Sequence, residues 1–201
     1  MPLATCPLAA LPTPPRRCGG ARPARAALAG LTLIELMVTI AVAAILMATA
    51  VPSFQAMIQR NRVVTEANSL VSDLQYARSE ALKQGLPVSL CVSADGSTCL
   101  GANTWHSGWI VFVDTAASGT IAAGVTPLRK RAGFVGGDTF VADSGATSLT
   151  YSRDGFAINM PAGGTTLVLH TSPVNAGATR CVALGLTGHQ TSQTPGTGNC
   201  T

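Results

Sequence analysis

The sequence has few charged and few aromatic residues for its length. Of 201 residues, 11% are charged and 4% are aromatic, whereas 47% are hydrophobic. So little charge excludes a long coiled coil, and so large an apolar share excludes a disordered chain. Only the run at residues 31–51 is apolar and long enough to cross a bilayer, which excludes a transporter with several spans. The length allows one domain of ordinary size and an additional segment.

The sequence also lacks the short motifs that mark common catalytic sites. It contains no phosphate-binding P-loop, no G-x-S-x-G nucleophile elbow, no H-E-x-x-H zinc motif and no G-x-G-x-x-G dinucleotide motif. The three histidines are scattered, and no cysteine pair has the C-x-x-C spacing of a metal site. We therefore predict a structural protein and not an enzyme, with no cofactor and no metal.

Positive charge is concentrated near the N-terminus. Residues 1–30 contain no acidic residue and four arginines, namely Arg16, Arg17, Arg22 and Arg25. The remaining residues balance nine basic against nine acidic side chains, so the formal charge of +4 lies before residue 31. The segment is rich in proline and alanine and has no periodicity, which is typical of a targeting leader. The basic charge is thus no sign of a nucleic-acid-binding body.

The apolar run at residues 31–51 contains a single charge, Glu35. As a helix it spans about 31 Å, close to the hydrocarbon core of a bilayer, and the preceding arginines place its N-terminus in the cytoplasm. Three interpretations compete: a signal peptide cleaved after Ala50, a plain anchor, and a segment in which Glu35 has a function. A membrane carboxylate costs on the order of 3 kcal/mol, and only the third interpretation gives it a purpose.

Residues 30–36, Gly-Leu-Thr-Leu-Ile-Glu-Leu, resemble the processing site of type IV pilins and type II secretion pseudopilins. In that family a prepilin peptidase cuts after the glycine, and the new amine is methylated. The resemblance implies a leader at 1–30, cleavage between Gly30 and Leu31, and methylation of Leu31, where phenylalanine is usual. It also implies that Glu35 faces the amine of a neighbouring subunit, which pairs both charges inside an apolar bundle and sets the axial register of a filament.

Residues 52–86 continue the apolar run as an amphipathic helix. Apolar residues recur at gaps of three and four, which places them on one helix face. They are Phe54, Met57, Ile58, Val64, Ala67, Leu70, Val71, Leu74, Ala77, Ala81 and Leu82. Pro52 can kink the helix, and Gly85 with Pro87 ends it. We expect one helix of about 50 residues, with its first half in lipid or filament and its second half packed on a domain.

Residues 87–186 change to short runs of strand-forming residues separated by Gly-containing turns, which predicts an antiparallel sheet packed on the helix, an α+β fold. The expected strands are 87–93, 108–114, 126–134, 139–142, 148–152, 156–160, 165–171 and 180–186. The clearest hairpin signal is the dipeptide Asp154-Gly155, which is expected to form the turn. Residues 187–201 are polar and Gly-rich and are expected to form a tail.

Several body motifs resemble the GspH/FimT branch of minor pilins and pseudopilins. They are Ala77-Arg78-Ser79-Glu80-Ala81, Asp95-Gly96, Trp105 with Gly108–Asp114, and Tyr151 with Gly155. Trp109 and Phe112 are expected to pack in the core. The resemblance implies a single-pass inner-membrane protein with its body in the periplasm. Its implied partners are other pilins in a filament, the prepilin peptidase and the inner-membrane assembly platform, in either a secretion pseudopilus or a type IV pilus.

The cysteines divide between the leader and the body. Cys6 and Cys18 precede the apolar run, and Cys91, Cys99, Cys181 and Cys200 follow it. Four cysteines allow three pairings, and export to an oxidising compartment favours disulfides. The local pairs Cys91–Cys99 and Cys181–Cys200 are the simplest arrangement, and buried free thiols are the alternative.

Nucleic acid is a rival partner. DNA-uptake members of the branch carry a glycine followed by closely spaced arginines, and the matching residues here, Gly188–Thr191, include no arginine. The one basic cluster, Arg129-Lys130-Arg131, lies in an expected strand, where at most two of its side chains share a face. A solvated strand face is therefore favoured over phosphate binding. Further rivals are a soluble exported β domain and, least of all, a hydrolase.

Overall fold

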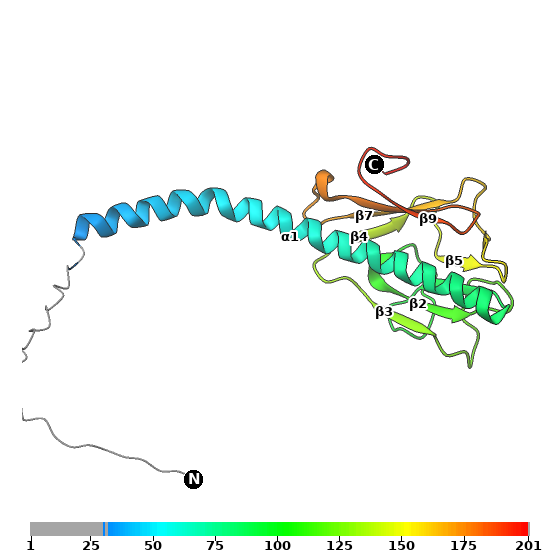
Figure 1. Ribbon diagram of the computed structural model, residues 1–201. Coiled ribbons are helices and arrows are strands. Elements are labelled where there is room, and N and C mark those ends of the chain that lie inside the picture. Colours follow the sequence, from blue (N-terminus) through cyan, green and yellow to red (C-terminus); the bar gives the residue numbers. More distant parts are fainter. Residues whose placement is uncertain (1–29, 31, 201) are drawn as a thin grey trace, which may run out of the picture. The chain divides into compact units, whose positions relative to one another are not determined.

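The computed structural model describes residues 30 and 32–200, and the chain divides into two units between Ala44 and Ile45. One helix, α1 (Leu33–Gln84), begins in the first unit and continues through the second (Figure 1). Pro52 lies inside the helix without ending it. The helix ends at Gly85, whose φ of +67° suits glycine and whose N–H donates to the Ala81 carbonyl at 2.9 Å.

The second half of α1 buries one stripe of side chains. The buried apolar residues are Val63, Ala67, Leu70, Leu74, Ala77 and Ala81, at alternating gaps of four and three. They form a single hydrophobic core with residues of both sheets. The apolar pattern of the sequence predicts Ala67, Leu70, Leu74, Ala77 and Ala81 correctly. It misses Val63, and four residues that it places on the packed face are exposed, namely Phe54, Met57, Ile58 and Leu82. The body covers the helix only from Val63 onward, so the apolar residues before it are not buried in the described structure.

The body contains two antiparallel sheets where the sequence predicts one. The first sheet has the order β3-β2-β1-β5-β6 and the second has the order β4-β7-β8-β9, and α1 runs alongside both (Figure 1). The first comprises β1 (Val88–Val92), β2 (Gly108–Val113), β3 (Arg129–Ala132), β5 (Ser148–Tyr151) and β6 (Ala157–Ile158). The second comprises β4 (Thr139–Ala142), β7 (Thr165–His170), β8 (Arg180–Leu184) and β9 (Gln190–Gln193). Short 3-10 helices occupy Trp105–Ser107 and Ala176–Ala178.

Strand β2 separates two groups of core side chains. Trp109 and Val111 face the main core, whereas Ile110 and Phe112 pack with Cys91 in a smaller cluster. Successive side chains of a strand point to opposite faces, so a fully buried strand serves two cores. Trp109 and Phe112 are completely buried, as the sequence predicts for packing residues.

Strand β9 lies in the segment that the sequence predicts to be only a polar tail. Its residues are exposed or half-buried, and it pairs with β8 so that Gln193 lies opposite Cys181. Neutral polar residues carry no apolar alternation, so the local pattern gives no sign of this strand. Backbone hydrogen bonds to β8 and the disulfide from Cys181 to Cys200 attach it to the body.

Candidate functional site

The start of α1 is capped by Thr32. The Glu35 N–H donates to Thr32 Oγ1 at 3.3 Å. Threonine at the N-cap and glutamate three residues later have the spacing of a capping box, a signal that the sequence contains and that our sequence analysis missed. Gly30 and Glu35 are exposed, and Leu31 lies outside the described residues. The local role of Glu35 is therefore at the helix N-terminus, where a carboxylate is favourable.

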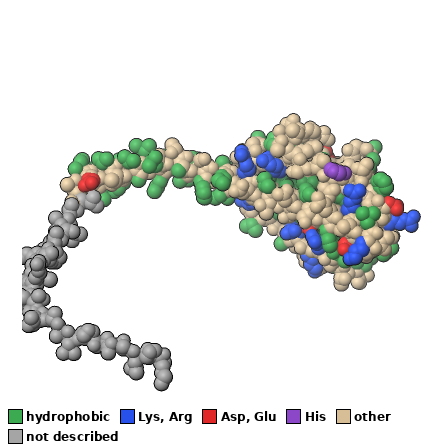
Figure 2. All heavy atoms as spheres, viewed as in Figure 1, with side chains coloured by type: hydrophobic (Ala, Val, Ile, Leu, Met, Phe, Trp, Pro, Cys, Tyr) green, Lys and Arg blue, Asp and Glu red, His purple; other side chains and the backbone are tan. Residues whose placement is uncertain are grey.

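The first half of α1 exposes its apolar side chains. An 18-residue window has a mean hydropathy of 2.3 and is entirely unburied, so the helix is long and apolar enough to cross a membrane. The exposed side chains include Leu33, Ile34, Met37, Ile40, Ile45, Leu46, Met47, Phe54, Met57 and Ile58. Figure 2 shows hydrophobic side chains along α1 up to the body. A continuous apolar surface of this kind marks contact with lipid or with another protein.

A buried carboxylate fastens the second half of α1 to the first sheet. Asp73, which is 2% exposed, accepts a hydrogen bond from Trp109 Nε1 at 3.0 Å. Its two oxygens also pair with Arg129 Nη1 at 3.1 Å and Arg131 Nη2 at 3.4 Å. The Arg129 guanidinium lies 3.7 Å from the centroid of the Tyr76 ring, a cation–π contact. Helix, edge strand β3 and core tryptophan thus meet at one side chain.

This network occupies two of the three candidate nucleic-acid residues. Arg129 and Arg131 share the face of β3 that meets α1, as strand alternation requires. Lys130 has no ion-pair partner among the residues described. The single charge of Asp73 offsets one of the two arginine charges, and both guanidinium groups are oriented toward the helix.

A second node joins α1 to two loops of the body. Asp138, whose side chain is fully buried, receives hydrogen bonds from Arg62 Nε and Nη2, both at 2.6 Å. The same carboxylate accepts the Ser172 N–H at 2.8 Å. One aspartate therefore holds the loop before β4 and the loop after β7 to the same turn of the helix, through the bidentate geometry that favours arginine.

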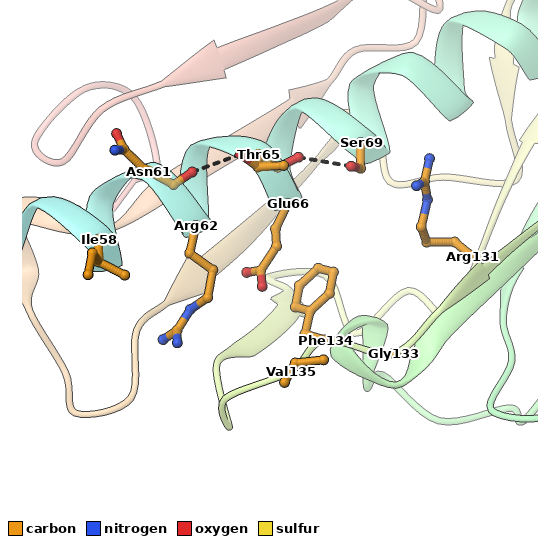
Figure 3. A pocket seen from close by; sticks show the side chains of 10 residues that line it. All are labelled: Ile58, Asn61, Arg62, Thr65, Glu66, Ser69, Arg131, Gly133, Phe134 and Val135. Carbon is orange, nitrogen blue, oxygen red and sulfur yellow. Dashed lines mark hydrogen bonds between the residues drawn. The ribbon is translucent and has the colours of Figure 1, made fainter. Parts of the chain in front are cut away.

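A pocket of about 540 Å³ opens beside this node, between α1 and the loop after β3. Figure 3 shows Arg62 and Glu66 extending from α1 toward the loop that carries Phe134 and Val135. Phe134 packs edge-on against Trp109 with ring centroids 5.9 Å apart, so the wall of the pocket rests on the core. The lining is mostly apolar, and it includes Ile58 at the exposed end of the helix.

Glu66 is the unusual acid of this pocket. One of its carboxyl oxygens, Oε2, is buried and has no hydrogen-bond partner. Burial, followed by the negative charge of Asp138, raises the pKa of Glu66 to about 7, although the nearby Arg62 opposes the shift. The carboxyl therefore changes protonation near neutral pH, whereas an ordinary glutamate is ionised there.

The four body cysteines form two local disulfides. Cys91 and Cys99 are joined across the loop after β1, and Cys181 and Cys200 join β8 to the end of the tail. The Cys181 and Cys200 sulfurs lie in a small apolar cluster with Val168 of β7. The second disulfide consequently closes the segment that contains β9. Cys6 and Cys18 lie outside the described residues.

The turn before β9 is tightly docked. Arg78 of α1 donates to the carbonyls of Thr187 and Gly188, each at 3.2 Å. Gly188 has a φ of +74°, and a side chain there would collide with the Gly155 carbonyl of the β5–β6 hairpin. The segment that the family resemblance aligns with a DNA-binding loop is thus fixed by packing between the helix and a hairpin.

Nothing in the described part of the chain forms a cluster of three or more metal-ligating side chains. The functional features that the structure does bring together are the capped, exposed half-helix and the two nodes that fix its other half to the body.

Comparisons with known proteins agree with this architecture. Residues 66–188 match the protein family described as "Type II transport protein GspH". The fold is similar to the type IV minor pilin FimU of Pseudomonas aeruginosa, with 28% identity and a TM-score of 0.54, covering 68% of this chain and 92% of that chain. A second crystal form of FimU gives 29% identity and a TM-score of 0.50, covering 64% and 90%.

The minor pseudopilin EpsH from the type 2 secretion system of Vibrio cholerae is also similar, with 15% identity and a TM-score of 0.48, covering 67% of this chain and 98% of that chain. No curated protein sequence matches this chain.

Proposed function

The chain belongs to the GspH family of type II transport proteins, and on that premise we propose that it is a minor subunit of a type II secretion pseudopilus or a type IV pilus. The subunit is structural. It crosses the inner membrane once, with its body in the periplasm, and it joins a filament through the first half of α1. This proposal is supported above all by the exposed apolar side chains of α1, which find no partner among the described residues.

We propose that the chain is processed before assembly. A prepilin peptidase cleaves between Gly30 and Leu31 and removes the arginine-rich leader, and the amine of Leu31 is then methylated. The new N-terminus lies one residue before Thr32, the cap of α1. Glu35 is four residues from that amine in the sequence. Both charges therefore lie at the same end of the apolar helix.

Assembly places Glu35 opposite the amine of a neighbouring subunit. A carboxylate alone in an apolar bundle is costly, and an opposite charge at hydrogen-bonding distance offsets that cost only in one axial register. The helix surface from Leu33 to Ile58 supplies the contact area, and the pair selects the register. The ATPase and platform that drive assembly lie outside this chain.

The processing step is tested by co-expression with a prepilin peptidase, followed by intact-mass measurement and N-terminal sequencing of the membrane fraction. We expect a chain that begins at methylated Leu31. G30L should block cleavage, and G163L, the same change at a glycine with open space around it and no left-handed φ, should leave cleavage intact. A chain that begins at Val51 would overturn the proposal, because it would have lost Glu35 and the assembly helix.

The register step is tested by E35Q, which keeps the shape of the side chain and removes its charge. We expect E35Q to be cleaved normally but to be missing from sheared filament fractions. Glutamine carries no charge that could balance the N-terminal amine of the neighbouring subunit. Replacement of an exposed acid on the body by D154N is the matched control and should leave assembly unchanged. Wild-type levels of E35Q in filaments would contradict the proposed role.

A further inference from the structure

Two exposed valines lie on the loops that Asp138 fastens to α1. Val135 is 85% exposed and Val174 is 78% exposed. The loop with Val135 ends at Asp138 itself, and the loop with Val174 is held through Ser172. Both loops are therefore fixed near the helix turn that contains Arg62. Exposed valines on anchored loops are costly in water unless something covers them.

Two hollows lie between these loops and the part of α1 that contains Met57 and Ile58. Val135 lines the same pocket as Ile58, and Asn175, next to Val174, lines a second hollow with Met57. Phe54, Met57 and Ile58 are 64%, 59% and 50% exposed. We refer to Phe54, Met57, Ile58, Val135 and Val174 as the apolar collar. Its members lie on α1 and on the two loops that Asp138 holds to the helix.

One positive charge at the apolar collar is unpaired. Helix residues 52–65 contain Arg60 and Arg62, and Glu66 follows in the pocket that Ile58 and Val135 line. Burial raises the pKa of Glu66 to about 7, so this acid carries only part of its charge at neutral pH. Arg60 is exposed and has no ion-pair partner among the described residues. The acid of the two loops, Asp138, is fully buried and paired. Exposed apolar groups around an unpaired arginine suit a surface that is apolar within and negative at its boundary.

The collar also lies at the depth of a bilayer surface. If the hydrocarbon core ends near Val51, Ile58 lies about 10 Å and Arg60 about 14 Å beyond it along the helix axis. Each headgroup layer of a bilayer is about 5–8 Å thick, so these residues lie a few ångströms beyond it, and a tilted helix and a flexible arginine reduce that gap. The collar thus lies near the outer edge of the headgroup layer.

We propose that the apolar collar rests on the outer surface of an anionic phospholipid bilayer, with Val135 and Val174 in the interface and Arg60 at the phosphates. The inference rests on the membrane insertion of α1 proposed above and adds a second membrane contact, made by the body. Docking would hold the unassembled subunit in one orientation. Entry into a filament would then require release of the collar from lipid.

The test uses the full chain with Cys6 and Cys18 replaced by serine, as single copies in nanodiscs of phosphatidylethanolamine and phosphatidylglycerol. Spin labels are placed by V135C and V174C, with F156C as the control. Phe156 is also exposed, but its hairpin lies beside Arg78 and Leu82, near the other end of the packed helix. We expect the oxygen-to-nickel collision ratio to be several-fold higher at 135 and 174 than at 156.

Two further variants test the chemistry. V135D should lower the docked population on the order of tenfold, as read by the label at 174, because the lost burial of a valine corresponds to about that factor. R60Q, or replacement of phosphatidylglycerol by phosphatidylcholine, should also raise exposure to nickel at both positions. No response to either change would exclude recognition of anionic lipid and overturn the proposal in that form.

The remaining outcomes separate the hypotheses. Equal ratios at 135, 174 and 156 would overturn lipid docking. Protection that appears only in vesicles with many copies would identify a second subunit as the occupant and would also overturn it. A label at L46C reports on insertion of the helix. If the label at residue 46 contacts hydrocarbon but the labels at the collar do not, only this inference is rejected. If the label at residue 46 does not contact hydrocarbon either, the proposed membrane insertion is rejected as well.

Discussion

Replacement of Asp73 is the most informative change in the body, because this carboxylate joins the helix to the core. D73A leaves the Trp109 N–H buried without an acceptor, which costs about 1–3 kcal/mol. It also removes two ion pairs, whose arginines are 43% and 42% exposed, so each contributes only about 0–1 kcal/mol. We expect a total loss of about 3 kcal/mol and a fall in Tm of about 10 °C.

D73N separates the two contributions. The amide oxygen can still accept from Trp109, so the loss should be limited to the charge, about 1 kcal/mol, and should shrink in high salt. Urea unfolding of the detergent-solubilised chain, followed by the near-ultraviolet circular dichroism of the buried tryptophans, measures both. D154N, at an exposed acid, is the control and should change stability by less than about 0.5 kcal/mol. The reasoning is refuted if D73A matches wild type, or if D73N is as damaging as D73A.

Three further changes test other parts of the fold. Removing the disulfide with C181A/C200A should lower stability by about 3 kcal/mol, as expected for cysteines 19 residues apart. Wild type unfolded in reductant should lose more, because reductant also opens the Cys91–Cys99 disulfide. Because the pKa of Glu66 is raised to about 7 from an ordinary 4.5, its folded form binds the proton more tightly. The contribution of Glu66 to the free energy of unfolding is therefore fully present below pH 4.5 and is lost as the pH rises through 7. Wild type should lose stability relative to E66Q between pH 4.5 and 7, as measured by parallel urea titrations. G188A should lower Tm more than G145A does, because both glycines have a φ of +74° but only Gly188 is packed against a carbonyl. Equal falls in Tm would show that the turn at Gly188 moves to make room for the added methyl group.

Much of the architecture is encoded locally and was predicted. The gaps of three and four from Ala67 to Ala81 give the packed helix face, and each predicted strand segment contains an observed strand. The resemblance to the GspH/FimT branch and the α+β fold are confirmed by the family match and by the similarity to FimU. Periodicity and short motifs suffice for these features because each depends on neighbours within a few turns or one strand.

The division of the strands into two sheets needed the tertiary structure. Strand β4 pairs with β7, and β1 pairs with both β2 and β5, across separations that no local pattern specifies. Strand β9 has no apolar alternation, and its place is set by its hydrogen bonds to β8. An edge strand of neutral polar residues looks like a tail in the sequence, because only its backbone takes part in the sheet.

The sequence by itself predicted the long helix and the family, and both are confirmed. It also contains the resemblance of residues 30–36 to a prepilin processing site, because that pattern lies in adjacent residues. The tertiary structure alone decided what the polar side chains do. It pairs Arg129 and Arg131 with Asp73, and it leaves one oxygen of Glu66 buried without a hydrogen-bond partner. The physical reason is that the energy of a charge or an exposed apolar group depends on which residues surround it, and folding alone supplies those neighbours.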